Sequence, residues 1–124
     1  MRYSYKDTVK EDVMEWMSYH EDDMDGMGRH ERFEYIYDRT WIADEVTGNA
    51  SGSYTMSRYD ARRNYMEDED SDEYIFQMIE DGFMSASDLG THIASSNWEW
   101  VDVNIRCWLL GDCITEILDE MYED

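Results

Sequence analysis

The segment from Glu21 to Arg32, EDDMDGMGRHER, has the residue types and part of the spacing of a calcium-binding loop. Four residues match the first, third, fifth and sixth positions of such a loop: Glu21, Asp23, Asp25 and Gly26. The twelfth position, which supplies a bidentate glutamate in an EF-hand, is Arg32. Because a cationic side chain at that position opposes cation binding, an acidic turn between two helices is the stronger interpretation, and we predict no metal site.

The sequence contains none of the common catalytic or cofactor-binding motifs. The three histidines, His20, His30 and His92, do not form a pair with metal-ligand spacing on one helix, although a zinc site assembled in three dimensions stays open. No P-loop, dinucleotide-binding glycine motif or nucleophile elbow is present. We therefore predict that the protein is not an enzyme and uses no cofactor.

Carboxylates are the one chemical group that the sequence concentrates. The run EDEDSDE places six of them in seven positions: Glu67, Asp68, Glu69, Asp70, Asp72 and Glu73. Runs of like charge repel themselves and are usually solvated. Three arginines precede the run, Arg58, Arg62 and Arg63, so internal pairing is one interpretation and a partner-binding surface is the other.

A second carboxylate group follows near the C-terminus, with the spacing of one helix face. Its members, at i, i+4, i+7 and i+11, are Asp112, Glu116, Asp119 and Glu123. Like charges at i,i+4 destabilise a helix by a few tenths of a kcal/mol, about 0.2–0.5 per pair. The helical rise separates Asp112 from Glu116 by about 6 Å, which is of the order of the step between neighbouring phosphates of a DNA strand. This spacing suggests a surface that resembles DNA.

The composition indicates a folded core beneath a strongly negative surface. The 124 residues include 31 Asp and Glu but only 10 Lys and Arg, for a net charge of -21, while 15% are aromatic. Large rings bury much apolar area, whereas the charge repels nucleic acid and anionic membranes and favours basic partners. We therefore expect no direct contact with nucleic acid or membrane.

The sequence also bears on location. The first residues lack the apolar stretch of a signal peptide, and no apolar run is long enough to span a bilayer. Cys107 and Cys113 are six residues apart in a predicted helix, a spacing that does not favour a disulfide. We expect reduced, buried thiols and a cytoplasmic protein.

Periodicity predicts helices along most of the chain. The first covers about residues 6–20 and presents Val9, Val13, Trp16 and Met17 on one face. Further helices are expected after residue 29, over 57–66, from 71 to near Gly82 and after a Ser85 cap. Alternating aromatic residues also allow a short β-hairpin near 33–56, and the glycine-rich segment 46–55 must be a loop or turn.

The last segment, from about residue 97, is apolar on nearly every side in its first half. A helix of this kind is buried, so we expect it to lie at the centre. The predicted fold is mainly α: a compact single-domain helical bundle, residues 1–124, around a buried C-terminal helix.

Two segments carry a resemblance to a known group of proteins. VTGNASGSYT, 46–55, and DVNIRCWLLGDCITEILDE, 102–120, resemble a family of small acidic proteins of unknown function carried by phages and mobile elements of gut bacteria. In size and charge the chain is also similar to phage-borne inhibitors of host defence, which include anti-CRISPR proteins and anti-restriction DNA mimics. The resemblance implies action in the cytoplasm of a bacterial host but transfers no role to individual residues.

Together these observations give the hypothesis of an inhibitor that occupies the basic cleft of a nucleic-acid-binding defence protein. Cas nucleases are the predicted partners and Cas9 is the first choice, because it recognises DNA largely through basic surfaces. The predicted contacts are the ten carboxylates of the two groups above. The alternative is an interaction module whose acidity serves solubility and whose partner binds a tyrosine-rich region around Tyr54, Tyr59 and Tyr65.

Overall fold

The computed structural model describes residues 6–40 and 61–122, and every regular element in these ranges is an α-helix. In chain order the helices are α1 (Lys6–Ser18), α2 (Arg29–Arg39), α4 (Ala61–Glu67), α5 (Ser71–Glu80), α6 (Ala86–Ala94) and α7 (Trp98–Met121). The mainly helical prediction is therefore confirmed. In these ranges no helix combines the length and the apolar character needed to cross a membrane.

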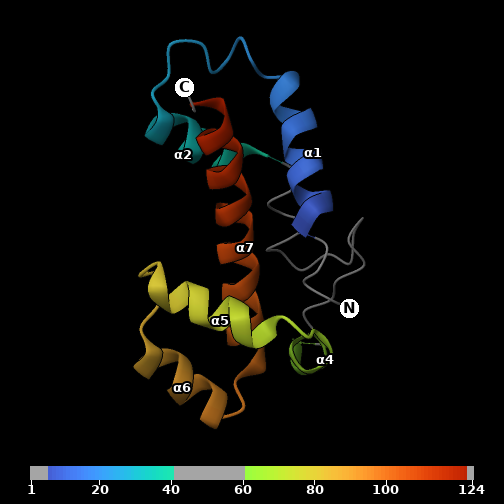
Figure 1. Cartoon of the computed structure of the whole chain (residues 1–124), viewed down its shortest axis with the longest axis vertical. Helices are drawn as coiled ribbons and strands as arrows, with labels where there is room; N and C mark the ends of the chain where they lie inside the picture. Colours follow the sequence, from blue (N-terminus) through green and yellow to red (C-terminus); the bar gives the residue numbers. More distant parts are fainter. Residues whose placement is uncertain (1–5, 41–60, 123–124) are drawn as a thin grey trace.

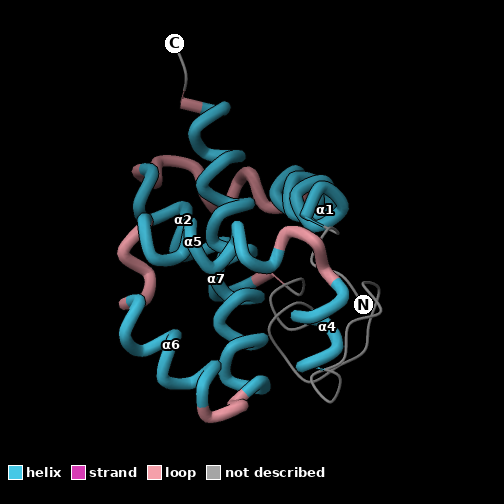
Figure 2. Tube along the Cα trace, turned by 60° about the horizontal axis from the view of Figure 1, so that its bottom comes forward, coloured by secondary structure: helices cyan, strands magenta, loops and turns pink. Residues whose placement is uncertain are grey.

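Helix α7 lies at the centre of the molecule and contacts all the other helices (Figure 1). Its 24 residues correspond to a length of about 36 Å at the usual helical rise. Helices α1 and α2 flank its C-terminal half, and α5 and α6 lie along its N-terminal half. In both views α1 and α4 lie on one side of α7, and α2 and α6 lie on the other (Figure 2). The predicted central position of the C-terminal helix is confirmed.

Burial along α7 follows its apolar residues. Those with little or no exposed surface are Val101, Ile105, Trp108, Leu109, Leu110, Cys113, Ile114, Ile117 and Leu118. They occupy more than one face of the helix because α7 has neighbours on several sides. Removing this much apolar surface from water is the main favourable contribution to folding.

Helix α1 is amphipathic and buries the four residues that its periodicity predicts. Val9, Val13, Trp16 and Met17 all pack in the core. The spacing i, i+4, i+7, i+8 places them on one face, which lies against α7. Helix α1 therefore has an outer face free for polar residues.

The suggested β-hairpin near 33–56 is wrong for the part of it that the structure describes. Phe33, Tyr35 and Tyr37 lie within α2, where only Ile36 is fully buried. The rings of Phe33 and Tyr37 stack with centroids 5.9 Å apart, a contact that the i,i+4 spacing of a helix provides. The alternation of aromatic residues thus misled the strand prediction, and residues 41–56 lie outside the described ranges.

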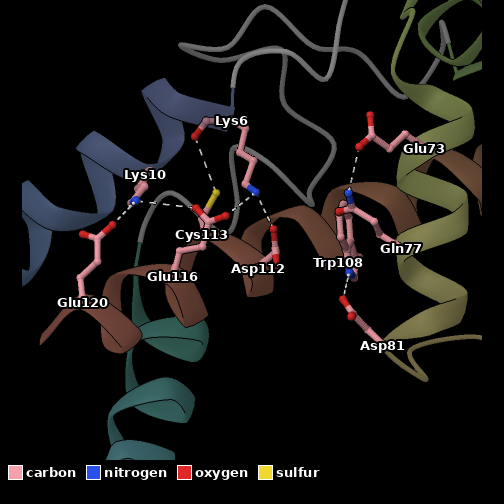
Figure 3. Close-up of polar contacts among 10 residues, drawn as sticks. All are labelled: Lys6, Lys10, Glu73, Gln77, Asp81, Trp108, Asp112, Cys113, Glu116 and Glu120. Carbon is pink, nitrogen blue, oxygen red and sulfur yellow. Dashed lines mark hydrogen bonds and ion pairs between the residues drawn. The ribbon is translucent and has the colours of Figure 1, made fainter. Parts of the chain in front are cut away.

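Helix α5 packs on α7 while two large aromatic residues, Phe76 within it and Phe83 after it, stay exposed. Phe76 and Phe83 are 59% and 43% exposed, whereas Met78 is fully buried. The contact is made through Met78 and through Tyr74, whose ring lies 5.7 Å from that of Trp108. The indole Nε1 of Trp108 donates to Asp81 Oδ2 at 2.9 Å (Figure 3). This bond satisfies a buried donor and ties the end of α5 to α7.

The cap predicted for the next helix is confirmed. The hydroxyl oxygen of Ser85 accepts a hydrogen bond from the backbone N–H of Asp88 at 3.1 Å. This bond satisfies one of the free N–H groups in the first turn of α6. Leu89 then carries the contact between α6 and the core.

One feature of α7 is not expected from an apolar central helix: it buries an ion pair. Asp102 and Arg106 are both fully buried, with Arg106 Nη2 at 2.9 Å from Asp102 Oδ2. Their i,i+4 spacing brings them together on one face. Removing one member of such a pair leaves a buried charge without its counter-charge, which costs much more than replacing both.

We predict that Arg106→Leu lowers the free energy of unfolding by about 3–5 kcal/mol, because it removes the cation that lies 2.9 Å from the buried carboxylate of Asp102. The double variant with Asp102→Leu should recover most of that loss. Urea unfolding followed by circular dichroism measures both values. A double variant as unstable as Arg106→Leu alone would show that the other contacts of these side chains, and not the uncompensated charge, determine the cost.

Candidate partner-binding surface

The predicted carboxylate stripe of α7 is engaged by cations of neighbouring helices. Lys6 Nζ lies 2.5 Å from Asp112 Oδ2 and 2.9 Å from Glu116 Oε1. Lys10 Nζ lies 2.8 Å from Glu120 Oε1 and 3.7 Å from Glu116 Oε2 (Figure 3). We call these five residues the α1–α7 clamp. The order of the pairs shows that α1 runs parallel to this half of α7.

The next member of the stripe is also paired. Asp119 forms an ion pair with Arg29 at the start of α2, and Glu123 lies outside the described residues. Cations from two helices therefore hold Asp112, Glu116 and Asp119. These three carboxylates already serve in the packing of α1 and α2 on α7, and their contact with a partner stays a prediction.

The clamp has electrostatic consequences for Lys6 and for the thiol beside it. Burial opposes the charge of Lys6, but hydrogen bonds and charge from Asp112 and Glu116 outweigh this effect and raise the pKa of Lys6. The Sγ of Cys113 lies 3.6 Å from the Lys6 carbonyl oxygen. Burial raises the pKa of Cys113 to about 12, so its thiol is neutral at physiological pH. Within the described residues neither Cys113 nor Cys107 is in a disulfide, and the predicted burial holds for Cys113, whereas Cys107 is only partly buried.

The acidic run 67–73 spans the end of α4, a short turn and the first turn of α5. Asp68 differs from its neighbours because only 6% of its surface is exposed. Its Oδ1 accepts a hydrogen bond from the backbone N–H of Asp70 at 2.8 Å. Asp68 therefore shapes the turn, and its burial makes it a poor candidate for direct partner contact.

The other five carboxylates of the run are exposed, and we call them the acidic turn: Glu67, Glu69, Asp70, Asp72 and Glu73. Within the described residues, the last four of these form no ion pair. Asp72 accepts from the hydroxyl of Tyr65 at 3.1 Å, and Glu73 accepts from Gln77 at 3.3 Å (Figure 3). Both donors are neutral, so these bonds orient the carboxylates without cancelling their charge.

Among the described residues, internal pairing of the run with the arginines before it is seen between Arg63 and Glu67. Arg63 Nε lies 3.0 Å from Glu67 Oε1, and this hydrogen bond lowers the pKa of Glu67. Arg58 lies outside the described residues. Asp72 and Glu73 lie in the first turn of α5, where the helix dipole favours negative charge. The helix dipole therefore favours the charge of Asp72 and Glu73.

A further acidic surface was missed by the sequence reasoning. Asp7, Glu11 and Glu15 lie on the outer face of α1, all exposed, and form no ion pair with any described residue. Their i, i+4, i+8 spacing could have revealed the stripe, which we call the α1 acidic face. Successive members are about 6 Å apart along the axis. It lies on the same side of α7 as α4, which leads into the acidic turn.

The segment that partly resembles a calcium loop forms a series of turns between α1 and α2. Gly26 adopts φ 82°, a left-handed conformation that favours glycine. Asp23 lies 3.3 Å from the ring of His20. Across the described ranges, no group of three or more His, Cys, Asp or Glu side chains is arranged to hold a metal ion.

The chain matches no protein-family model, no curated protein and no solved structure. The function must therefore be argued from the surface itself.

We predict that Lys6→Met lowers the free energy of unfolding by about 1–2 kcal/mol, because Asp112 and Glu116 lose their partly buried cation. Lys10→Met is the matched control and should cost less, since its ion pair with Glu120 is more exposed. The raised pKa of Lys6 means that its stabilisation is complete below the unfolded-state pKa of about 10.4 and is lost as pH rises through the higher folded value. Thermal unfolding at pH 7 and pH 9 should thus give the same loss. Equal costs for the two variants would contradict the central role of Lys6.

We also predict that the midpoint of thermal unfolding rises as sodium chloride increases from low to physiological concentration. Unpaired carboxylates outnumber the clamp pairs, and screening weakens repulsion once the Debye length falls from about 30 Å to about 8 Å. Calorimetry across a salt series measures the midpoint. A falling midpoint would mean that attractive ion pairs dominate the surface.

Proposed function

We propose that the protein is a DNA mimic that inhibits a nucleic-acid-binding bacterial defence protein by occupying its basic cleft. The observation that carries this proposal is that four exposed carboxylates of the acidic turn, Glu69, Asp70, Asp72 and Glu73, form no ion pair with any described residue and lie on the side of α7 that also bears the α1 acidic face. A folded protein holds these charges in a fixed arrangement, which a disordered acidic tail does not.

The spacing of the charges supports the proposal. Along α1 the carboxylates recur about every 6 Å, and such a series offers a basic cleft a pattern comparable to a phosphate backbone. A protein that binds DNA mainly through backbone charge gains little discrimination against such a surface. Cas9 stays the first candidate among the targets, because its positively charged channel recognises the guide–target heteroduplex through backbone shape and charge.

Ion pairs inside the fold show which carboxylates are less available to a partner. Asp112, Glu116 and Asp119 are held by Lys6, Lys10 and Arg29, so their charge is partly neutralised before any partner arrives. We therefore place the principal contact at the acidic turn and the α1 acidic face, with the α7 stripe as a secondary surface. This neutralisation also favours the alternative function, an interaction module whose remaining acidity serves solubility.

The decisive variant replaces four carboxylates of the acidic turn: Glu69→Gln, Asp70→Asn, Asp72→Asn and Glu73→Gln. We expect the fold to survive and inhibition of DNA cleavage by a purified Cas9–guide RNA complex to weaken by more than about tenfold, since complementary charge steers association. Inhibition should also decline steeply as salt increases, and duplex DNA should displace the variant more readily than the parent.

The matched control removes the same charge from exposed positions elsewhere: Glu31→Gln, Asp38→Asn, Glu80→Gln and Glu99→Gln. We expect it to inhibit within about twofold of the parent, since distant surface charges act mainly through weak, screened fields. If the parent does not inhibit Cas9, a pull-down from bacterial lysate at low and high salt, eluted with duplex DNA, tests the wider proposal. Capture that is insensitive to both salt and DNA would favour the interaction module.

A further inference from the structure

A methionine-rich groove opens at the end of the molecule where α1 and α7 finish. Its cavity volume is about 500 Å³, within the range of binding pockets. The apolar lining consists of Met14 and Met17 from α1, Met24 from the following turn, and Ile117 and Met121 from α7. Four of these five are methionines, whose flexible, polarisable side chains adapt to partners of differing shape.

Two of the methionines that line this groove are exposed, whereas Met17 and Met24 are buried. Met14 is 47% exposed and Met121 is 50% exposed. Tyr19, directly after α1, and Tyr122, directly after α7, are also among the exposed large hydrophobic residues. Exposed apolar groups that cluster with a concave surface mark interaction sites more often than isolated ones do.

The rim of the groove is acidic. Glu21 and Asp25 line it and form no ion pair with any described residue, and Glu120 lines it while pairing with Lys10. The lining also contains one cation, Arg32, whose Nε donates to the Met27 carbonyl oxygen at 3.2 Å and whose guanidinium lies over the Tyr122 ring. The groove therefore combines an apolar floor with a negative edge.

We propose that this groove binds an amphipathic, basic α-helix of a partner protein. The apolar stripe of such a helix would pack on the methionines, and its lysines or arginines would face Glu21 and Asp25. Helix-in-groove recognition uses this combination of an apolar floor and complementary charge. A second copy of this chain is disfavoured as the occupant, because each copy has a net charge of -21. The inference does not rest on DNA mimicry, which uses other residues.

The test uses the full chain and a labelled 18-residue peptide in which leucines form one helical face and lysines the other. A second peptide has the same composition in a scrambled order that places leucines all round the helix. Fluorescence anisotropy gives each affinity. We expect the amphipathic peptide to bind at least tenfold more tightly than the scrambled one. Equal binding would overturn the proposal, since net charge alone would then account for it.

Two protein variants locate the site. Met14→Gln with Met121→Gln keeps side-chain length and helix propensity and should weaken binding of the amphipathic peptide by at least about tenfold. The control, Met66→Gln with Phe76→Gln, alters two exposed apolar residues on α4 and α5 and should stay within twofold. Circular dichroism establishes that both variants fold. Equal effects of the two variants would overturn the assignment to this groove.

Two further measurements test the role of the charged rim and the possibility that a second copy of the chain fills the groove. Glu21→Gln with Asp25→Asn should weaken binding severalfold at low salt and much less at high salt, because screening removes the contribution of exposed charges. No effect at low salt would overturn the role of the rim. Sedimentation of the parent alone should show a monomer. A dimer that Met14→Gln with Met121→Gln abolishes would make a second copy the occupant and overturn the proposal.

Discussion

Burial of α7 is the interaction on which the other elements depend. Each of the other helices packs on α7, so removal of its apolar surface from water holds them in place. A helix in this position must be apolar on several sides, which explains why its buried residues do not form a single stripe. The arrangement also explains why Asp102 and Arg106 occur together: any charge on the covered part of α7 needs a counter-charge within reach.

The same constraint determines how the scarce cations are used. The C-terminal half of α7 carries carboxylates along the side that α1 approaches, and packing would be repulsive without Lys6 and Lys10. With 10 Lys and Arg against 31 Asp and Glu, cations used for packing are not available to neutralise the surface. Exposed carboxylates such as Glu69 and Asp70 therefore form no ion pair with any described residue. The high negative surface charge is in this sense a consequence of where the positive charge is required.

The sequence was sufficient to predict the helical class, the central C-terminal helix, the buried face of α1 and the Ser85 cap, because each depends on local periodicity or spacing. It was not sufficient where tertiary packing decides. Residues 33–37 fit two patterns, since Phe33, Tyr35 and Tyr37 alternate as in a strand whereas Ile36 falls at helical spacing from Phe33. The outward position of Phe76 depends on which face of α5 meets α7. The pairing of Asp112 with Lys6 joins residues 106 positions apart, and no local signal predicts it. The burial of Asp68 likewise follows from the turn between α4 and α5.

The exposed surface of α1 carries both the α1 acidic face and one side of the methionine-rich groove. Its outer face carries Asp7, Glu11 and Glu15, and its C-terminal end carries Met14 beside the groove. Long-range charge acts mainly on the rate of encounter and is reduced by salt, whereas burial of apolar side chains acts after contact and is nearly independent of salt. A basic partner would thus be attracted by the carboxylates and retained by the methionines. Substitutions of the α1 carboxylates should therefore mainly slow association, in a salt-dependent way. Substitution of Met14 should mainly speed dissociation, with little dependence on salt.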